Sequence, residues 1–170
     1  QGKTVLVRID SDVDLENHKI LDDTRLRSSL KTIKYILENH GKVILLGHLG
    51  RPGKKFKVQS SEFRVEDGLS LEPIAKWYAD KFQGRLEENK IGEFSSWKIT
   101  DNISLLENLR FYKGEEENDP EFAKQLASLG DIYVDEAFAV SHRDHGSITG
   151  IAKLLPSYAG FHLASEIETL

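Results

Sequence analysis

The sequence contains no cysteine and no methionine among its 170 residues. The absence of cysteine excludes disulfide bonds, thiolate metal ligands and cysteine nucleophiles, and it is compatible with a reducing compartment. No apolar run approaches the roughly 20 residues that a membrane-spanning helix needs, and no charged-then-apolar leader is visible. We therefore expect a cytoplasmic protein without membrane contacts, and we expect that Gln1 is not the natural start.

The chain also lacks an excess of basic residues. Its formal net charge of -5 argues against broad nucleic-acid binding, so any cluster of arginine and histidine is expected to form a local site in an acidic protein. The composition is 39% hydrophobic and 30% charged, which is ordinary for a globular protein. With no internal repeat and no low-complexity linker, we predict a single domain over residues 1–170, which ends within a helical pattern as if cut.

Residues 42–55, KVILLGHLGRPGKK, organise the rest of the chain. Residues 43–46 are apolar and partly β-branched, which predicts a strand covered on both faces in a parallel sheet. The strand ends in a glycine- and proline-braced turn that carries His48 and Arg51. Because ligands bind at the carboxyl ends of parallel strands, this turn suggests an anion site; the alternative is an ordinary surface loop.

The other segments alternate between strand and helix patterns with short connections, as in βαβ units. Helices are expected to begin at the caps near Asp23, Ser70 and Asp119. The acidic run 115–117 is interpreted as a solvated loop, and residues 84–102 are assigned at most one short strand. Strands are expected at residues 4–9, 43–46, 103–106 and 132–134, helices at 23–41, 70–82, 119–130, 151–155 and 161–170, and a lysine-rich loop before Gly68. This order predicts an α/β, Rossmann-like three-layer sandwich with a mostly parallel central sheet.

Charged side chains follow four of the predicted strands, and one more stands at the entrance to the first helix. In a parallel sheet these strand ends meet at one edge. Like charges gathered there repel one another unless an anion occupies the patch, and arginine forks suit phosphate and carboxylate oxygens. We therefore predict a small ligand with two or more negative groups. The residues are Asp10, Arg25, His48, Arg110, His142 and Arg143.

Read in order, the segments VLVRID, DDTRLR, GKVILLGHLGRP, LEPIAKWYADKF, LLENLRF and DEAFAVSHRDHGS closely resemble the N-terminal domain of phosphoglycerate kinase. The resemblance covers essentially the whole chain. It implies the first of two α/β lobes joined by a hinge, a lobe that binds 3-phosphoglycerate or 1,3-bisphosphoglycerate. The absent C-terminal lobe would bind Mg-ATP or Mg-ADP, so this chain alone is expected to be a monomer that is inactive and holds no cofactor or metal.

The resemblance also implies roles for individual residues in this glycolytic phosphoryl transfer. Arg25 matches the catalytic arginine nearest the reacting group, Asp10 matches an aspartate that bonds the substrate hydroxyl, and Asp12 stands where a substrate-contacting asparagine is usual. The acceptor carboxylate is already ionised, so no general base is needed and arginines can shield the two anions. The other implied substrate-binding residues are His48, Leu49, Gly50, Arg51, Arg110, His142 and Arg143.

The chain departs from the family pattern in several places. The family's Phe-Asn-Val-Pro after the first aspartate appears as residues 11–14, SDVD, which adds a negative charge at Asp12 and loses the rigidity of proline at Asp14. Ala139 replaces a glycine, and Gly47 stands where serine is common. These changes put the affinity for an anionic substrate in question.

Two other functions stay open. One is a module that binds a phosphorylated acid without chemistry. The other is a phosphatase of the haloacid dehalogenase type, because Asp10 and Asp12 follow an apolar strand, although that interpretation leaves HLGRP and ENLRF unexplained. A calcium loop starting at Asp10 is excluded because Leu15 stands where glycine is required. His142 and His145 lack a third ligand, so no metal site is predicted.

Overall fold

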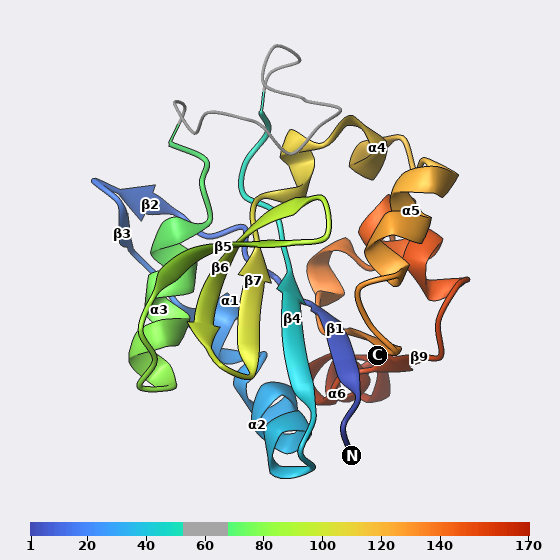
Figure 1. The fold of residues 1–170 in the computed structure, drawn as a ribbon, viewed down its shortest axis with the longest axis horizontal. Coiled ribbons are helices and arrows are strands. Elements are labelled where there is room, and N and C mark those ends of the chain that lie inside the picture. The colour runs from blue at the N-terminus through green and yellow to red at the C-terminus, as the bar shows by residue number, and fades with distance from the viewer. Residues whose placement is uncertain (53–67) are drawn as a thin grey trace.

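The computed structural model describes residues 1–52 and 68–170, and its centre is a seven-stranded sheet (Figure 1). The strand order is β5-β6-β7-β4-β1-β8-β9. Strands β7, β4, β1, β8 and β9 are parallel, whereas β5 and β6 form an antiparallel hairpin along β7. The predicted mostly parallel sheet is therefore confirmed. The strands are β1 (Thr4–Arg8), β4 (Lys42–Leu46), β5 (Glu87–Ile91), β6 (Phe94–Thr100), β7 (Ile103–Leu106), β8 (Ile132–Asp135) and β9 (Ser157–Ala159), with a separate ribbon of β2 (Leu15–Glu16) and β3 (Lys19–Ile20).

Helices cover both faces of the sheet, which gives three layers. Successive side chains of a strand point to opposite faces. Val5 and Val7 of β1 accordingly pack with α1, α2 and α3, whereas Leu6 packs with Phe122 and Leu126 of α5 on the other face (Figure 1). The helices are α1 (Thr24–Arg27), α2 (Leu30–Glu38), α3 (Glu72–Lys81), α4 (Lys113–Glu116), α5 (Pro120–Ala127) and α6 (Phe161–Thr169); shorter helical turns are η2 (Leu109–Phe111), η3 (Phe138–Val140) and the π-helical turn η4 (Gly146–Gly150).

Two of the predicted helix starts depend on side-chain caps. The Asp119 carboxylate accepts a hydrogen bond of 2.8 Å from the backbone N–H of Phe122, so the predicted cap of α5 is confirmed. Ser70 lies one residue before the N-cap position of α3, which is Leu71. Its hydroxyl still accepts a hydrogen bond of 3.1 Å from the N–H of Glu72, so it satisfies one of the open donors at the start of that helix.

The first helix was predicted to be continuous from about Asp23 and to end at Gly41, and both parts of this prediction are wrong. It is split into α1 and α2 at a serine pair, where the Ser29 hydroxyl bonds the carbonyl of Leu26 at 2.7 Å. Serine side chains compete in this way with helical backbone bonds. Gly41 does not supply the left-handed residue that follows α2; His40 does, with a φ of 58°.

The two segments with the weakest patterns also differ from expectation. Residues 84–102 hold two strands, β5 and β6, where at most one was expected. Near the C-terminus α6 is confirmed, but the helical turn before Pro156 spans residues 146–152, and the short strand β9 follows that proline. The lysine-rich loop predicted before Gly68 lies outside the described residues. Over residues 1–52 and 68–170, the helices are all too short or too polar to cross a membrane.

Candidate functional site

The carboxyl ends of the parallel strands meet at one edge of the sheet, as predicted. Asp10 follows β1, His48 follows β4, Arg110 lies in η2 after β7, and Arg143 follows β8 and η3. This edge lies toward the top of Figure 1. The fold therefore brings together side chains that are up to 133 positions apart in the sequence.

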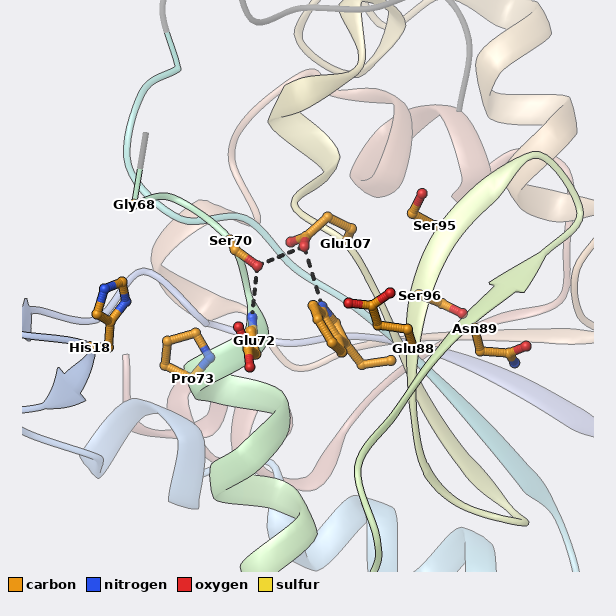
Figure 2. A pocket seen from close by; sticks show the side chains of 11 residues that line it. His18, Gly68, Ser70, Glu72, Pro73, Glu88, Asn89, Ser95, Ser96 and Glu107 are labelled. Atoms are coloured by element: carbon orange, nitrogen blue, oxygen red, sulfur yellow. Dashed lines mark hydrogen bonds between the residues drawn. The ribbon is translucent and has the colours of Figure 1, made fainter. Parts of the chain in front are cut away.

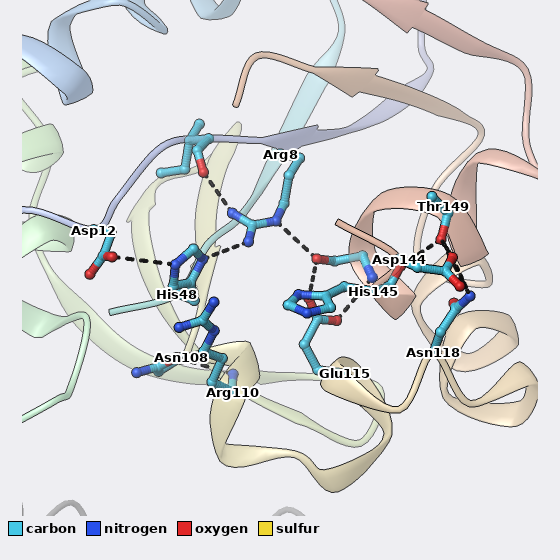
Figure 3. Close-up of polar contacts among 12 residues, drawn as sticks. Arg8, Asp12, His48, Asn108, Arg110, Glu115, Asn118, Asp144, His145 and Thr149 are labelled. Atoms are coloured by element: carbon cyan, nitrogen blue, oxygen red, sulfur yellow. Dashed lines mark hydrogen bonds and ion pairs between the residues drawn. The ribbon is translucent and has the colours of Figure 1, made fainter. Parts of the chain in front are cut away.

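Arg8, which the sequence did not single out, lies at the centre of the site (Figure 3). Its side chain is fully buried at the end of β1. It donates hydrogen bonds from Nε to Ser147 Oγ at 2.9 Å and from Nη1 to the carbonyl of Ile9 at 2.7 Å, and its Nη2 lies 2.7 Å from His48 Nδ1. An arginine within a strand that is covered on both faces is the signal that could have revealed it, because a buried charge needs partners.

His48 is almost completely buried between Arg8 and Asp12. Its Nε2 lies 3.7 Å from Asp12 Oδ2. Burial lowers the pKa of His48 from 6.5 to about 4, and Arg8 and Arg110 act in the same direction, while Asp12 opposes them. The imidazole is therefore neutral at neutral pH, so the positive charge of this patch comes from its arginines.

Asp12 braces the turn after β4. Its Oδ1 accepts a hydrogen bond of 2.9 Å from the N–H of Gly50, whose φ of 61° favours glycine. The contact with His48 and then the Gly50 N–H hold the pKa of the Asp12 carboxyl well below its usual range, although burial acts against them. The unexpected negative charge at position 12 is thus ionised and half-exposed at the rim of the patch.

Two of the departures from the family pattern are coupled in space. A Cβ at Gly47 would lie 2.3 Å from Ser11 Oγ, so the serine hydroxyl leaves no room for a side chain there. Ser11 instead donates a hydrogen bond of 2.7 Å to the carbonyl of His48. The small residue at 47 is therefore the steric counterpart of the serine at 11.

The turn after β4 is tied to the turn after β7. Asn108 donates a hydrogen bond of 2.8 Å to the carbonyl of Leu49, and Arg110 Nη1 donates one of 2.8 Å to the carbonyl of Gly50. The Leu49 side chain itself is buried in the core. The HLGRP and ENLRF motifs are therefore joined by hydrogen bonds, and one of these bonds holds the Arg110 guanidinium.

Arg110 and Arg143 each carry a buried Nε that has no hydrogen-bond partner among the described residues. Burial lowers the pKa of Arg110, and repulsion from Arg143 and Arg8 adds to this effect, whereas Glu116 opposes it. Burial also lowers the pKa of His145, with Arg110, Arg143 and Arg8 contributing. Buried donors without partners are costly, so these guanidinium groups are suited to an anion.

Arg25 lies on α1 at the margin of this cluster. Its Nη1 is 3.3 Å from Asp10 Oδ1, and its side chain is 52% exposed, whereas Asp10 is largely buried. Arg51 is exposed. His142 is also exposed, and no hydrogen bond or ion pair joins it to the patch within residues 1–52 and 68–170.

The position of Glu115 contradicts the expectation from the sequence. The run 115–117 was expected to be a solvated loop, but Glu115 lies in α4 and is fully buried (Figure 3). It accepts hydrogen bonds from the Ser147 N–H, at 2.9 Å, and from the Ser147 hydroxyl. Burial raises the pKa of Glu115, although Arg8 and Ser147 oppose this shift. The carboxylate is buried because it faces the cationic patch.

A cavity of about 580 Å³ lies elsewhere, between the start of α3 and the β5–β6 hairpin (Figure 2). Among the described residues, its walls carry the carboxylates of Glu72, Glu88 and Glu107 and neither arginine nor lysine. Glu107 is used structurally, since it accepts hydrogen bonds from Ser70 Oγ at 2.7 Å and from the N–H of Leu71 at 2.7 Å. This cavity does not suit an anion.

The chain is an α/β protein whose arginines gather at the carboxyl edge of a parallel sheet, the place where such folds hold their ligands. The family model "Phosphoglycerate kinase" matches residues 1–170. The chain belongs to the phosphoglycerate kinase family.

Individual relatives agree with this assignment. The phosphoglycerate kinase of Dictyoglomus turgidum is 46% identical over 177 residues, which cover 100% of this chain and 42% of the relative. The chloroplastic phosphoglycerate kinase 1 of Arabidopsis thaliana is 46% identical over 175 residues, which cover 100% of this chain and 35% of the relative. The solved phosphoglycerate kinase from Coxiella burnetii superposes with a TM-score of 0.78 at 35% identity, covering 98% of this chain and 41% of that one. The chain thus spans less than half the length of these relatives.

The buried His48 predicts how stability depends on pH. Its folded-state pKa of about 4 lies below the ordinary 6.5, so the unfolded chain takes up this proton first as the pH falls. The free energy of unfolding should therefore lose about 3 kcal/mol from this group between pH 6.5 and 4. Urea unfolding of the chain and of His48→Gln at several pH values measures it. An equal loss in both proteins would contradict the assignment.

Proposed function

We propose that this chain is the substrate-binding lobe of a phosphoglycerate kinase and that it binds 3-phosphoglycerate or 1,3-bisphosphoglycerate. The observation that carries the proposal is that the buried Nε atoms of Arg110 and Arg143, beside Arg8 and His48, have no hydrogen-bond partner in the described part of the chain. Residues 1–170 form one domain, and a second lobe completes the enzyme. That lobe binds the magnesium nucleotide, which supplies or accepts the phosphoryl group.

The residues of this chain would position and shield two anions. Arg110 and Arg143, with His48, Arg51 and the turn at Leu49 and Gly50, would bind the phosphate that is not transferred, and His142 would lie beside it. Asp10 would hold the substrate hydroxyl, and Asp12 would contact the ligand at the rim. Arg25, half-exposed on α1, would neutralise charge on the transferring phosphoryl group. Closure of the second lobe would exclude water and bring the substrates into line.

Calorimetric titration of the chain with 3-phosphoglycerate, at low and at moderate salt, tests the proposal. We expect one-to-one binding that weakens as salt screens the exposed part of the patch. Glycerol, which lacks both anionic groups, serves as the control ligand and should not bind. Absence of 3-phosphoglycerate binding by a chain shown to be folded by circular dichroism would overturn the proposal for this lobe.

Asp12→Asn should tighten binding of 3-phosphoglycerate by roughly fivefold, about 1 kcal/mol. The amide oxygen can still accept the Gly50 N–H bond of 2.9 Å, while one negative charge leaves the rim of the site. The same titration measures it, with Asp14→Asn as a control because Asp14 is an exposed carboxylate nearby. Unchanged or weaker binding would show that Asp12 does not face the ligand.

A non-catalytic module that binds phosphorylated acids is the second candidate, because the same buried donors support binding without chemistry. Turnover with 3-phosphoglycerate and Mg-ATP, once this lobe is joined to a nucleotide-binding lobe, distinguishes the two. The phosphatase alternative has less support. A phosphatase of this type also needs acidic residues after a later strand, for which Asp135 and Glu136 are the candidates. Glu136 instead accepts hydrogen bonds from the start of α6, and Asp12 is engaged with Gly50 and His48, so these carboxylates do not gather around one phosphoryl site.

For the cellular context, we propose a cytoplasmic monomer that does not bind nucleic acid. The net charge of -5 and the absence of cysteine support this proposal. Sedimentation of the chain over a range of concentrations tests its oligomeric state.

A further inference from the structure

A chain of polar contacts runs from the rim of the patch to its buried end (Figure 3). It begins at Asp12, continues through His48, Arg8 and Ser147, and ends at Glu115. The last four of these residues are at most 1% exposed. Arg8, Ser147 and Glu115 lie behind His48 in this chain of contacts, so they act on the site through His48.

The contact between Arg8 and His48 determines which imidazole nitrogen carries the hydrogen. Arginine offers only donors and does not lose its proton in proteins. At 2.7 Å from Arg8 Nη2, His48 Nδ1 must therefore accept the hydrogen bond and be unprotonated. The neutral ring then carries its hydrogen on Nε2, the nitrogen that faces Asp12 at 3.7 Å.

The orientation of Arg8 is set from the other side. Ser147 Oγ accepts the Nε–H of Arg8 at 2.9 Å, so the single hydroxyl hydrogen is free to point to Glu115. Glu115 also accepts the Ser147 N–H at 2.9 Å, which fixes the serine backbone. Glu115 is thus the buried acceptor at which the series of directed hydrogen bonds ends.

We propose that Glu115 is a positioning residue which, through Ser147 and Arg8, holds His48 as the neutral tautomer with its hydrogen on Nε2. His48 then presents a hydrogen-bond donor, and not a cation, to the site. Arg8, Asp12 and Arg110 are the charged groups that face it. The use of this donor toward a phosphate or carboxylate oxygen rests on the proposed function, whereas the tautomer itself does not.

Nitrogen-15 NMR of the histidine ring nitrogens in the ligand-free chain tests the inference. We expect His48 to show an unprotonated Nδ1 and a protonated Nε2 from pH 5.5 to 8. In Glu115→Gln and Ser147→Ala, we expect His48 to populate both tautomers. Ser128→Ala, which removes an exposed hydroxyl, should leave the His48 signals unchanged.

A charged His48 or an Nδ1–H tautomer at pH 7 in the unaltered chain would overturn the inference, and this measurement does not depend on any variant folding. Unchanged His48 signals in both folded variants would overturn the role of Glu115. Binding of 3-phosphoglycerate should weaken roughly tenfold in each variant. If the unaltered chain has the expected tautomer but does not bind 3-phosphoglycerate, the proposed function fails and the tautomer assignment stands.

Discussion

Arg25→Ala is expected to reduce kcat at least 10³-fold in a full-length phosphoglycerate kinase that carries this lobe, because an arginine that stabilises a transferring phosphoryl group contributes roughly 10³–10⁵-fold. The fold should survive. The side chain is 52% exposed, and its described interaction is the ion pair with Asp10 at 3.3 Å, of a kind that contributes at most about 1 kcal/mol. A coupled assay of 3-phosphoglycerate turnover with Mg-ATP measures the loss, and circular dichroism checks the fold.

Arg27 provides a matched control on the same helix. Its side chain is 54% exposed and pairs with Asp23 at 2.8 Å, so Arg27→Ala removes a comparable exposed ion pair. We expect Arg27→Ala to retain most of the activity. Near-normal turnover in Arg25→Ala, or an equal loss in both variants, would show that Arg25 has no special role in the transfer.

The parallel part of the sheet could be predicted because its strands carry their own signal. The strands β4 and β7 are short apolar runs that end abruptly in polar turns, and they are buried where the pattern indicated. The convergence of His48, Arg110 and Arg143 followed from strand direction alone, since no side-chain detail is needed to know that parallel strands end at one edge.

The buried part of the site could not be predicted, because it depends on partners that are distant in sequence. Arg8 and Ser147 are separated by 139 positions, and Glu115 and Ser147 by 32. From the sequence, a glutamate in an acidic run is expected to be exposed to solvent. In the fold, Glu115 is buried because a serine hydroxyl and nearby arginines surround its carboxylate. A charged side chain can be buried only when the fold supplies a partner for it, and a local sequence pattern does not contain that partner.

The hairpin at the sheet edge was missed for a different reason. The strand β5 is mostly charged and exposed, so it has no alternation of apolar and polar residues to indicate a strand. The backbone of β5 is extended because every residue from Glu87 to Ile91 pairs with a residue of β6. Charged residues on an edge strand also discourage pairing with another molecule, so the feature that concealed this strand suits its place in the sheet.

Arg110→Ala is expected to weaken binding of 3-phosphoglycerate by this chain at least 100-fold. Hydrogen bonds to charged groups contribute about 1.5–3 kcal/mol each, and a guanidinium can offer two to a phosphate. Arg110 Nη1 donates a hydrogen bond of 2.8 Å to the Gly50 carbonyl, while the buried Nε has no partner among the described residues. The substitution therefore removes both the proposed donor to the ligand and the hydrogen bond from Arg110 that holds the turn after β4.

Two further variants separate these effects. Arg110→Lys keeps the charge but not the planar fork, so it should bind with intermediate affinity and with a salt dependence close to that of the unaltered chain. Arg85→Ala removes a side chain that is 91% exposed and is expected to change the affinity by less than about twofold. If Arg110→Ala binds as tightly as Arg85→Ala, the ligand does not use the buried guanidinium groups. The anion site would then have to lie outside this edge of the sheet, and the family resemblance would describe the ancestry of the lobe without its binding activity.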